Sequence, residues 1–106
     1  MPRILSPLIA AMVLLAPVAA LADSIDGTWC EPGGPRSLQI RGSSFVNPGG
    51  HAVTGLYRRH DGGYTVPEGE AGAGDIVVVT LLGEESLRVA EPGTTALTWT
   101  RCQLNS

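Results

Sequence analysis

Short runs of β-forming residues, each bounded by glycine, proline or aspartate, recur about every ten residues after residue 26 of this 106-residue chain. The eight runs lie at residues 27–30, 37–41, 44–46, 51–59, 64–66, 76–82, 86–90 and 95–102. Strands that follow one another with short turns favour an antiparallel meander, and eight of them close into a barrel without exposed edges. We therefore expect an all-β fold, a small antiparallel meander barrel, with a β-sandwich as the alternative.

Two segments bear on the details of this barrel. Run 76–82 is the most apolar and is β-branched in its first half, which favours a strand over a helix. Its weak alternation predicts burial on both faces, or a strand that crosses the core. Asp61-Gly62-Gly63 is expected to form a turn, and residues 67–74, rich in Gly, Ala and Glu, to form a mobile loop.

The first 22 residues have the pattern of a cleaved secretory signal peptide. A short positive start at Arg3 precedes an apolar core at 4–15, and Ala20-Leu21-Ala22 fits an A-x-A cleavage site, with 18–20 as a second choice. The core is shorter than the roughly 20 apolar residues of a membrane span. Residues 23–106 are therefore expected to form one exported domain. Because arginine is the only basic residue besides histidine and Ala and Gly abound, as in GC-rich bacterial genes, we expect a periplasmic or secreted protein.

Charge and cysteines narrow the class of protein. After residue 22 the chain contains six arginines and ten acidic residues, so the domain carries a net charge of −4 with histidine neutral. That balance disfavours nucleic acid and membrane insertion. Cys30 and Cys102 are the two cysteines, 72 positions apart, and an even pair in an oxidising compartment predicts a disulfide. In a closed barrel this bridge brings Glu31 opposite Arg101; alternatively it ties a rim loop to the barrel end.

Gly27-Thr28-Trp29 resembles the G-x-W motif of lipocalins and other calycins. The resemblance implies that Trp29 lies on the first strand and closes one end of the barrel, and that an arginine of the last strand, here Arg101, covers it. A guanidinium stacked on an indole is worth roughly 0.5–2 kcal/mol. The format is also similar to that of bacterial periplasmic lysozyme and protease inhibitors. Trp29 and Trp99 are expected in the core.

Catalytic and metal chemistry have little support in the sequence. Ser37, Ser43, Ser44 and Ser86 lack the surroundings of an activated nucleophile, and no cofactor motif is present. The candidate metal ligands His51, His60 and Asp61 are few and scattered. We expect no enzyme, no cofactor and no metal site, with a metal protein or enzyme as the less favoured alternative.

The remaining candidates are surface contacts for another exported or periplasmic protein. They comprise the basic cluster Arg58-Arg59-His60, the two tyrosines that flank the expected turn, and the acids of the glycine-rich loop: Tyr57, Arg58, Arg59, His60, Tyr64, Glu68 and Glu70. Loops 47–51 and 67–74 are the expected contact segments. A barrel this small is filled by its own side chains. We therefore expect a non-catalytic protein-binding module, an inhibitor or accessory subunit, with a calycin-like carrier of a small apolar ligand as the alternative.

Overall fold

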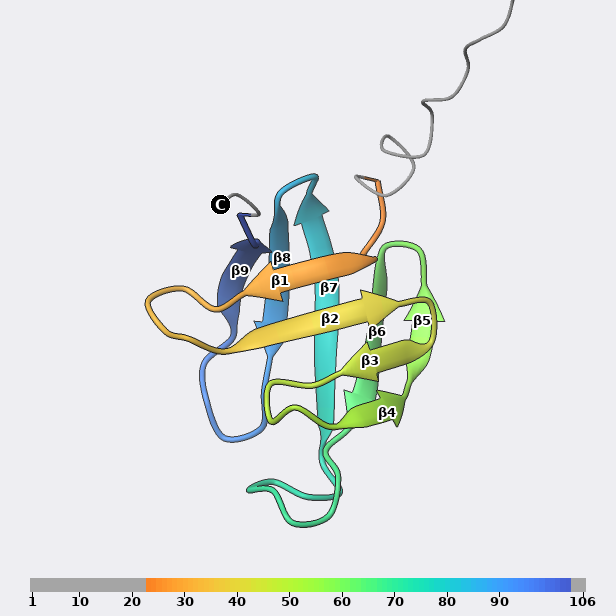
Figure 1. The fold of residues 1–106 in the computed structure, drawn as a ribbon, viewed down its shortest axis with the longest axis vertical. Helices are drawn as coiled ribbons and strands as arrows, with labels where there is room; N and C mark the ends of the chain where they lie inside the picture. Colours follow the sequence, from red (N-terminus) through yellow and green to blue (C-terminus); the bar gives the residue numbers. More distant parts are fainter. Residues whose placement is uncertain (1–22, 104–106) are drawn as a thin grey trace, which may run out of the picture.

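The computed structural model describes residues 23–103, which form one curled sheet of nine antiparallel strands (Figure 1). The strands are β1 (Gly27–Cys30), β2 (Ser37–Arg41), β3 (Ser44–Val46), β4 (Ala52–Thr54), β5 (Leu56–Arg58), β6 (Asp61–Thr65), β7 (Ile76–Gly83), β8 (Ser86–Ala90) and β9 (Leu97–Arg101). Their order is β4-β3-β2-β1-β9-β8-β7-β6-β5. This nearly closed barrel confirms the predicted meander. The expected leader at 1–22 lies outside the described residues.

The expected single strand at 51–59 is divided at Gly55 into β4 and β5. β4 pairs with β3, whereas β5 pairs with β6, so the chain changes partners at this glycine. The Gly55 amide donates to Ser43 O (2.8 Å). A Cβ at Gly55 would lie 2.3 Å from the Gly63 carbonyl oxygen, so a side chain does not fit. This corner brings the two ends of the sheet together and explains why there are nine strands instead of eight.

The expected turn at Asp61-Gly62-Gly63 is wrong, because all three residues belong to β6. The chain reverses one step earlier, at residues 59–60. A Cβ at Gly62 or Gly63 would approach a carbonyl oxygen of the neighbouring strand to 2.4 Å. These glycines therefore allow neighbouring strands to approach closely. Glycine within a strand sequence can mark such an approach as well as a turn.

The apolar run that forms β7 is buried on one face only. Val77 and Val79 point into the core, whereas Ile76 and Val78 are exposed. The expectation that both faces are buried, or that the strand crosses the core, is therefore wrong. Ordinary strand alternation holds here although the outward positions carry apolar side chains.

The first and last strands, β1 and β9, pair with each other. Cys30 and Cys102 form the predicted disulfide, with Cα atoms 5.0 Å apart. Trp29, not Glu31, lies opposite Arg101 in the ladder. The expected pairing of Glu31 with Arg101 is wrong because Glu31 already belongs to the β1–β2 loop, where its amide donates to Arg36 O (3.0 Å).

Large side chains fill the interior of the barrel. The buried apolar residues are Ile25, Trp29, Leu38, Ile40, Phe45, Tyr64, Val66, Val77, Val79, Leu87, Val89 and Trp99. Both tryptophans are completely buried, and the rings of Phe45 and Tyr64 lie 5.6 Å apart between centroids. Interior positions of a barrel of this size are occupied by side chains, as they are here.

Candidate functional site

Three loops meet at one end of the barrel, which we call the mouth; they are loops 47–51, 66–75 and 91–94 (Figure 1). The mouth surrounds a hollow of about 460 Å³. Buried Tyr64, Val66 and Val77 provide apolar lining, and Arg36 of the β1–β2 connection stands at the rim. The two loops expected to make contacts, 47–51 and 67–74, therefore lie side by side.

Glu70 joins these two loops. From loop 66–75, its carboxylate contacts two residues of loop 47–51: Asn47 Nδ2 lies 2.9 and 3.0 Å from the two oxygens, and His51 Nδ1 lies 2.5 Å from Oε2. The hydrogen bond from Asn47, followed by that with His51, lowers the pKa of Glu70 below its ordinary value. Asn47 also accepts from the His51 amide through Oδ1 (2.8 Å), so loop 47–51 is itself ordered around Asn47. The loop expected to be mobile is thus folded back and anchored.

Arg36 binds two carboxylates on the other side of the mouth. Its guanidinium lies 2.7 Å from Glu31 Oε2 and 2.9 Å from Glu91 Oε1. Hydrogen bonds with Glu31 and then Glu91 raise the pKa of Arg36, and the same contact with Arg36 lowers the pKa of Glu31. The guanidinium carbon also lies 5.6 Å from the ring centroid of Trp99. Arg36 therefore connects the rim to the core.

Tyr64 faces the mouth hollow from the core side. Burial, followed by the negative charges of Glu91 and Glu70, raises the pKa of its phenol, so Tyr64 is neutral at physiological pH. The indole nitrogen of Trp99 is a buried donor without a hydrogen-bond partner within residues 23–103. The mouth thus combines an apolar floor with a charged rim.

The opposite end is closed by Arg101, whose guanidinium carbon lies 4.3 Å from the Trp29 ring centroid. Arg101 donates to the backbone carbonyls of Ser24 (2.9 Å), Asp26 (2.8 Å) and Glu84 (2.6 Å). The Trp29 indole donates to Ile25 O (2.9 Å). Arg101 therefore covers Trp29 at this end of the barrel, as expected.

Asp26 orders the same end. Burial raises its pKa, but hydrogen bonds from the Tyr57 hydroxyl, the Gly42 amide and the Ser24 hydroxyl outweigh that effect and hold the pKa below its ordinary value. The Gly42 amide lies 2.7 Å from Oδ1, and the Tyr57 hydroxyl donates to Oδ2. Tyr57 is thereby committed to an internal contact.

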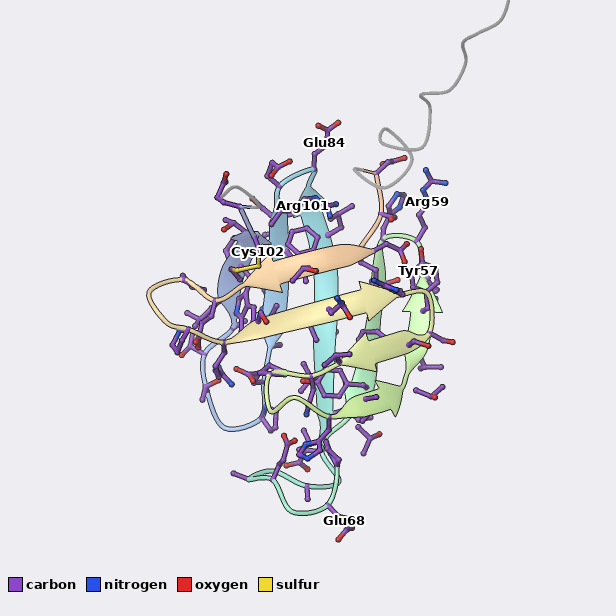
Figure 2. All side chains as sticks on the ribbon, in the orientation of Figure 1. Tyr57, Arg59, Glu68, Glu84, Arg101 and Cys102 are labelled. Atoms are coloured by element: carbon purple, nitrogen blue, oxygen red, sulfur yellow. A yellow bond between two sulfur atoms is a disulfide. The ribbon has the colours of Figure 1, made fainter. Side chains whose placement is uncertain are left out.

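The residues expected as partner contacts are divided between the two ends of the barrel. Figure 2 shows Arg59 and Glu68 at opposite extremes of the barrel. Arg59 lies 3.0 Å from Asp23 Oδ2, and His60 lies 3.6 Å from Asp23 Oδ1. Tyr64 is 4% exposed and packs in the core, below the mouth hollow. Glu68 and Glu70 belong to the mouth.

The residues of the metal alternative are not brought together. His51 is bound to Glu70 at the mouth, whereas His60 lies in the β5–β6 turn and Asp61 begins β6 at the opposite end. Across the described part of the chain, no group of three or more His, Cys, Asp and Glu residues is placed to hold a metal ion. Nor do residues 23–103 contain a helix long and apolar enough to cross a membrane.

Sequence reasoning missed Arg36 and Glu91 as members of the mouth, and for Asn47 it predicted the contact loop but not the bond to Glu70. Each comes from a different loop, and their neighbours in sequence carry no motif. The one available signal was a charged residue next to a turn rich in Pro and Gly: Arg36 follows residues 32–35, and Glu91 precedes Pro92-Gly93. Comparison with protein families, with curated proteins and with solved structures finds no match.

Proposed function

We propose that this chain is an exported, non-catalytic protein-binding module that engages its partner through the mouth. The observation that carries the proposal is the fixed arrangement of three loops around a hollow: Glu70 joins two of them, and Arg36 holds the third through Glu91. Binding loops held in place before contact lose little entropy on binding. An inhibitor or an accessory subunit would use such a surface.

The charges at the rim indicate the kind of partner. Glu70 and Glu91 line the hollow together with Arg36, which also binds Glu31. Glu68 is exposed on loop 66–75. The apolar floor accepts a side chain, and the excess of carboxylates favours a basic one. We therefore propose a partner that inserts a lysine or arginine, whose apolar stem contacts Val66 and Val77.

Site-specific photo-crosslinking in the producing cell tests this proposal. A photoreactive amino acid is placed at Glu68 and at Thr94, on two separate loops of the mouth, and at Arg59 at the opposite end as a matched control. We expect the same heterologous adduct from both mouth positions and none from position 59. Adducts of equal yield from all three positions, or none from the mouth of a folded protein, would contradict the proposal.

A small-ligand carrier is the second candidate, and two observations favour it. The hollow of about 460 Å³ lies within the usual range for small-molecule sites. The contact of Arg101 with Trp29 also agrees with the resemblance to lipocalins. A carrier would place an apolar molecule against Tyr64, so the intrinsic fluorescence of the protein should change when bound lipid is extracted.

A further inference from the structure

The outer face of strands β5, β6 and β7 carries an apolar patch that neither the core nor the mouth uses. Leu56 is 79% exposed, Ile76 62% and Val78 46%. These side chains border a hollow of about 690 Å³ that also includes Gly63. Contiguous exposed apolar patches on soluble proteins mark interaction sites.

The register of β5 and β6 places two complementary pairs side by side on this face. Leu56 lies directly opposite Gly63, and Arg58 lies directly opposite Asp61. Leu56 therefore projects beside a glycine, which leaves space next to it, and the positive charge of Arg58 lies beside the negative charge of Asp61. A Cβ at Gly63 would lie 2.4 Å from Val77 O, so no other residue fits at this position. The space beside Leu56 is therefore not filled by a side chain of β6.

We propose that this face joins two copies of the chain about a twofold axis that runs parallel to the strands, between β5 and β6. That single rotation exchanges the two strands. Leu56 of each copy then lies over Gly63 of the other, and Arg58 of each copy lies over Asp61 of the other. Such an interface is isologous: the same patch meets itself, so each contact occurs twice.

The charges argue for a second copy rather than an unrelated chain. Within one molecule, Arg58 Nε lies 3.1 Å from Asp61 Oδ1, and the side chains are 81% and 40% exposed. An exposed ion pair of this kind contributes little to the stability of a monomer. When two copies meet, the same groups form an alternating array of four charges, which fixes the register between the copies. The mouth uses other residues, so this proposal and the proposed function fail independently.

Sedimentation velocity on the protein purified from its producing cells tests the proposal, at concentrations up to about 100 µM, which would populate a dimer with a micromolar Kd. We expect a reversible dimer. Leu56→Asp should weaken it at least about tenfold, because a carboxylate would be buried over Gly63. Arg58→Asp should weaken it by repulsion from Asp61, and the double variant R58D/D61R should restore it.

Arg88→Asp is the matched control, since Arg88 is exposed on the same outer face but lies on β8, away from the axis. It should leave the dimer unchanged. Circular dichroism confirms that each variant is folded. A wild-type protein that stays monomeric at 100 µM overturns the proposal. So does a dimer that Leu56→Asp and Arg58→Asp leave intact, because the copies would then meet elsewhere. If the protein is monomeric and Leu56→Asp abolishes a heterologous adduct, the face belongs to a different partner and the proposal is wrong.

Discussion

Trp29 and Arg101 lie directly opposite each other in the β1–β9 ladder, and the guanidinium of Arg101 covers the indole at 4.3 Å. One residue belongs to the first strand and the other to the last. Their contact therefore joins the first and last strands of the meander, next to the ladder pair of Cys30 and Thr100. The closed end of the barrel depends on this pair together with the disulfide.

Replacement of Arg101 by lysine should destabilise the protein although the charge is kept. Lysine cannot reproduce both the stacking on Trp29 and the fork of donors to three backbone carbonyls. We expect a loss of about 2–4 kcal/mol in the free energy of unfolding, measured by denaturant titration. Arg88→Lys, on the exposed face of β8, should change it by less than about 0.5 kcal/mol. Equal effects of the two substitutions would show that the Arg101 contacts are not structural.

Reduction of the Cys30–Cys102 bridge should lower stability sharply. The bridge closes a loop of 72 residues, and the loss of that constraint on the unfolded chain is worth about 4 kcal/mol in the chain-entropy model. Denaturant titration with and without a reducing agent measures the effect. An unchanged midpoint under conditions that fully reduce both cysteines would contradict this role.

Acid should unfold the protein partly through Asp26. Its pKa is held below the ordinary 3.8 in the folded state, so its contribution to stability is complete above that value. The contribution is lost as the pH falls through the lower folded pKa. Asp26→Asn should therefore reduce stability at neutral pH and flatten the dependence on pH below about 4. If the wild type and this variant lost stability in parallel between pH 5 and pH 2, the carboxylate would not be the group responsible.

Glu70→Gln should loosen the mouth without unfolding the barrel. Glutamine keeps the size of the side chain but removes the charge that accepts from Asn47 and His51. Amides of loop 66–75, such as that of Ala73, should exchange faster with deuterium, while those of the core strands stay protected. Glu68→Gln on the same loop provides the control. Equal exchange in the two variants would show that Glu70 does not anchor the loop.

The meander and the disulfide could be predicted because both depend on local signals. Strand and turn residues alternate along the chain, and two cysteines leave a single pairing. The division of the fourth strand at Gly55 and the place of Gly62 and Gly63 within β6 could not be predicted in this way. A glycine in the sequence is compatible both with a turn and with a close approach of two strands. Which of the two occurs depends on the position of the neighbouring strand, which the local sequence does not specify.

The mouth could be predicted only in part. Its loops were recognised by their Gly and Pro content, but the contacts of Arg36 with Glu91 and of Glu70 with Asn47 join residues 55 and 23 positions apart. Such pairs depend on the register of the closed sheet, which the composition of each loop does not encode. The same limit explains why Tyr57 and Tyr64 were expected at a surface. Tyr64 is buried on the inward face of β6, and Tyr57 on β5 is partly buried against the core.

A native mass spectrum of the protein isolated from its producing cells tests most directly whether this filled barrel works through its mouth. The account predicts a disulfide-bonded chain, two daltons below its reduced mass, that retains a different protein as its partner and carries no small molecule. A stoichiometric small-molecule adduct in place of a protein partner would contradict the account and favour the ligand carrier.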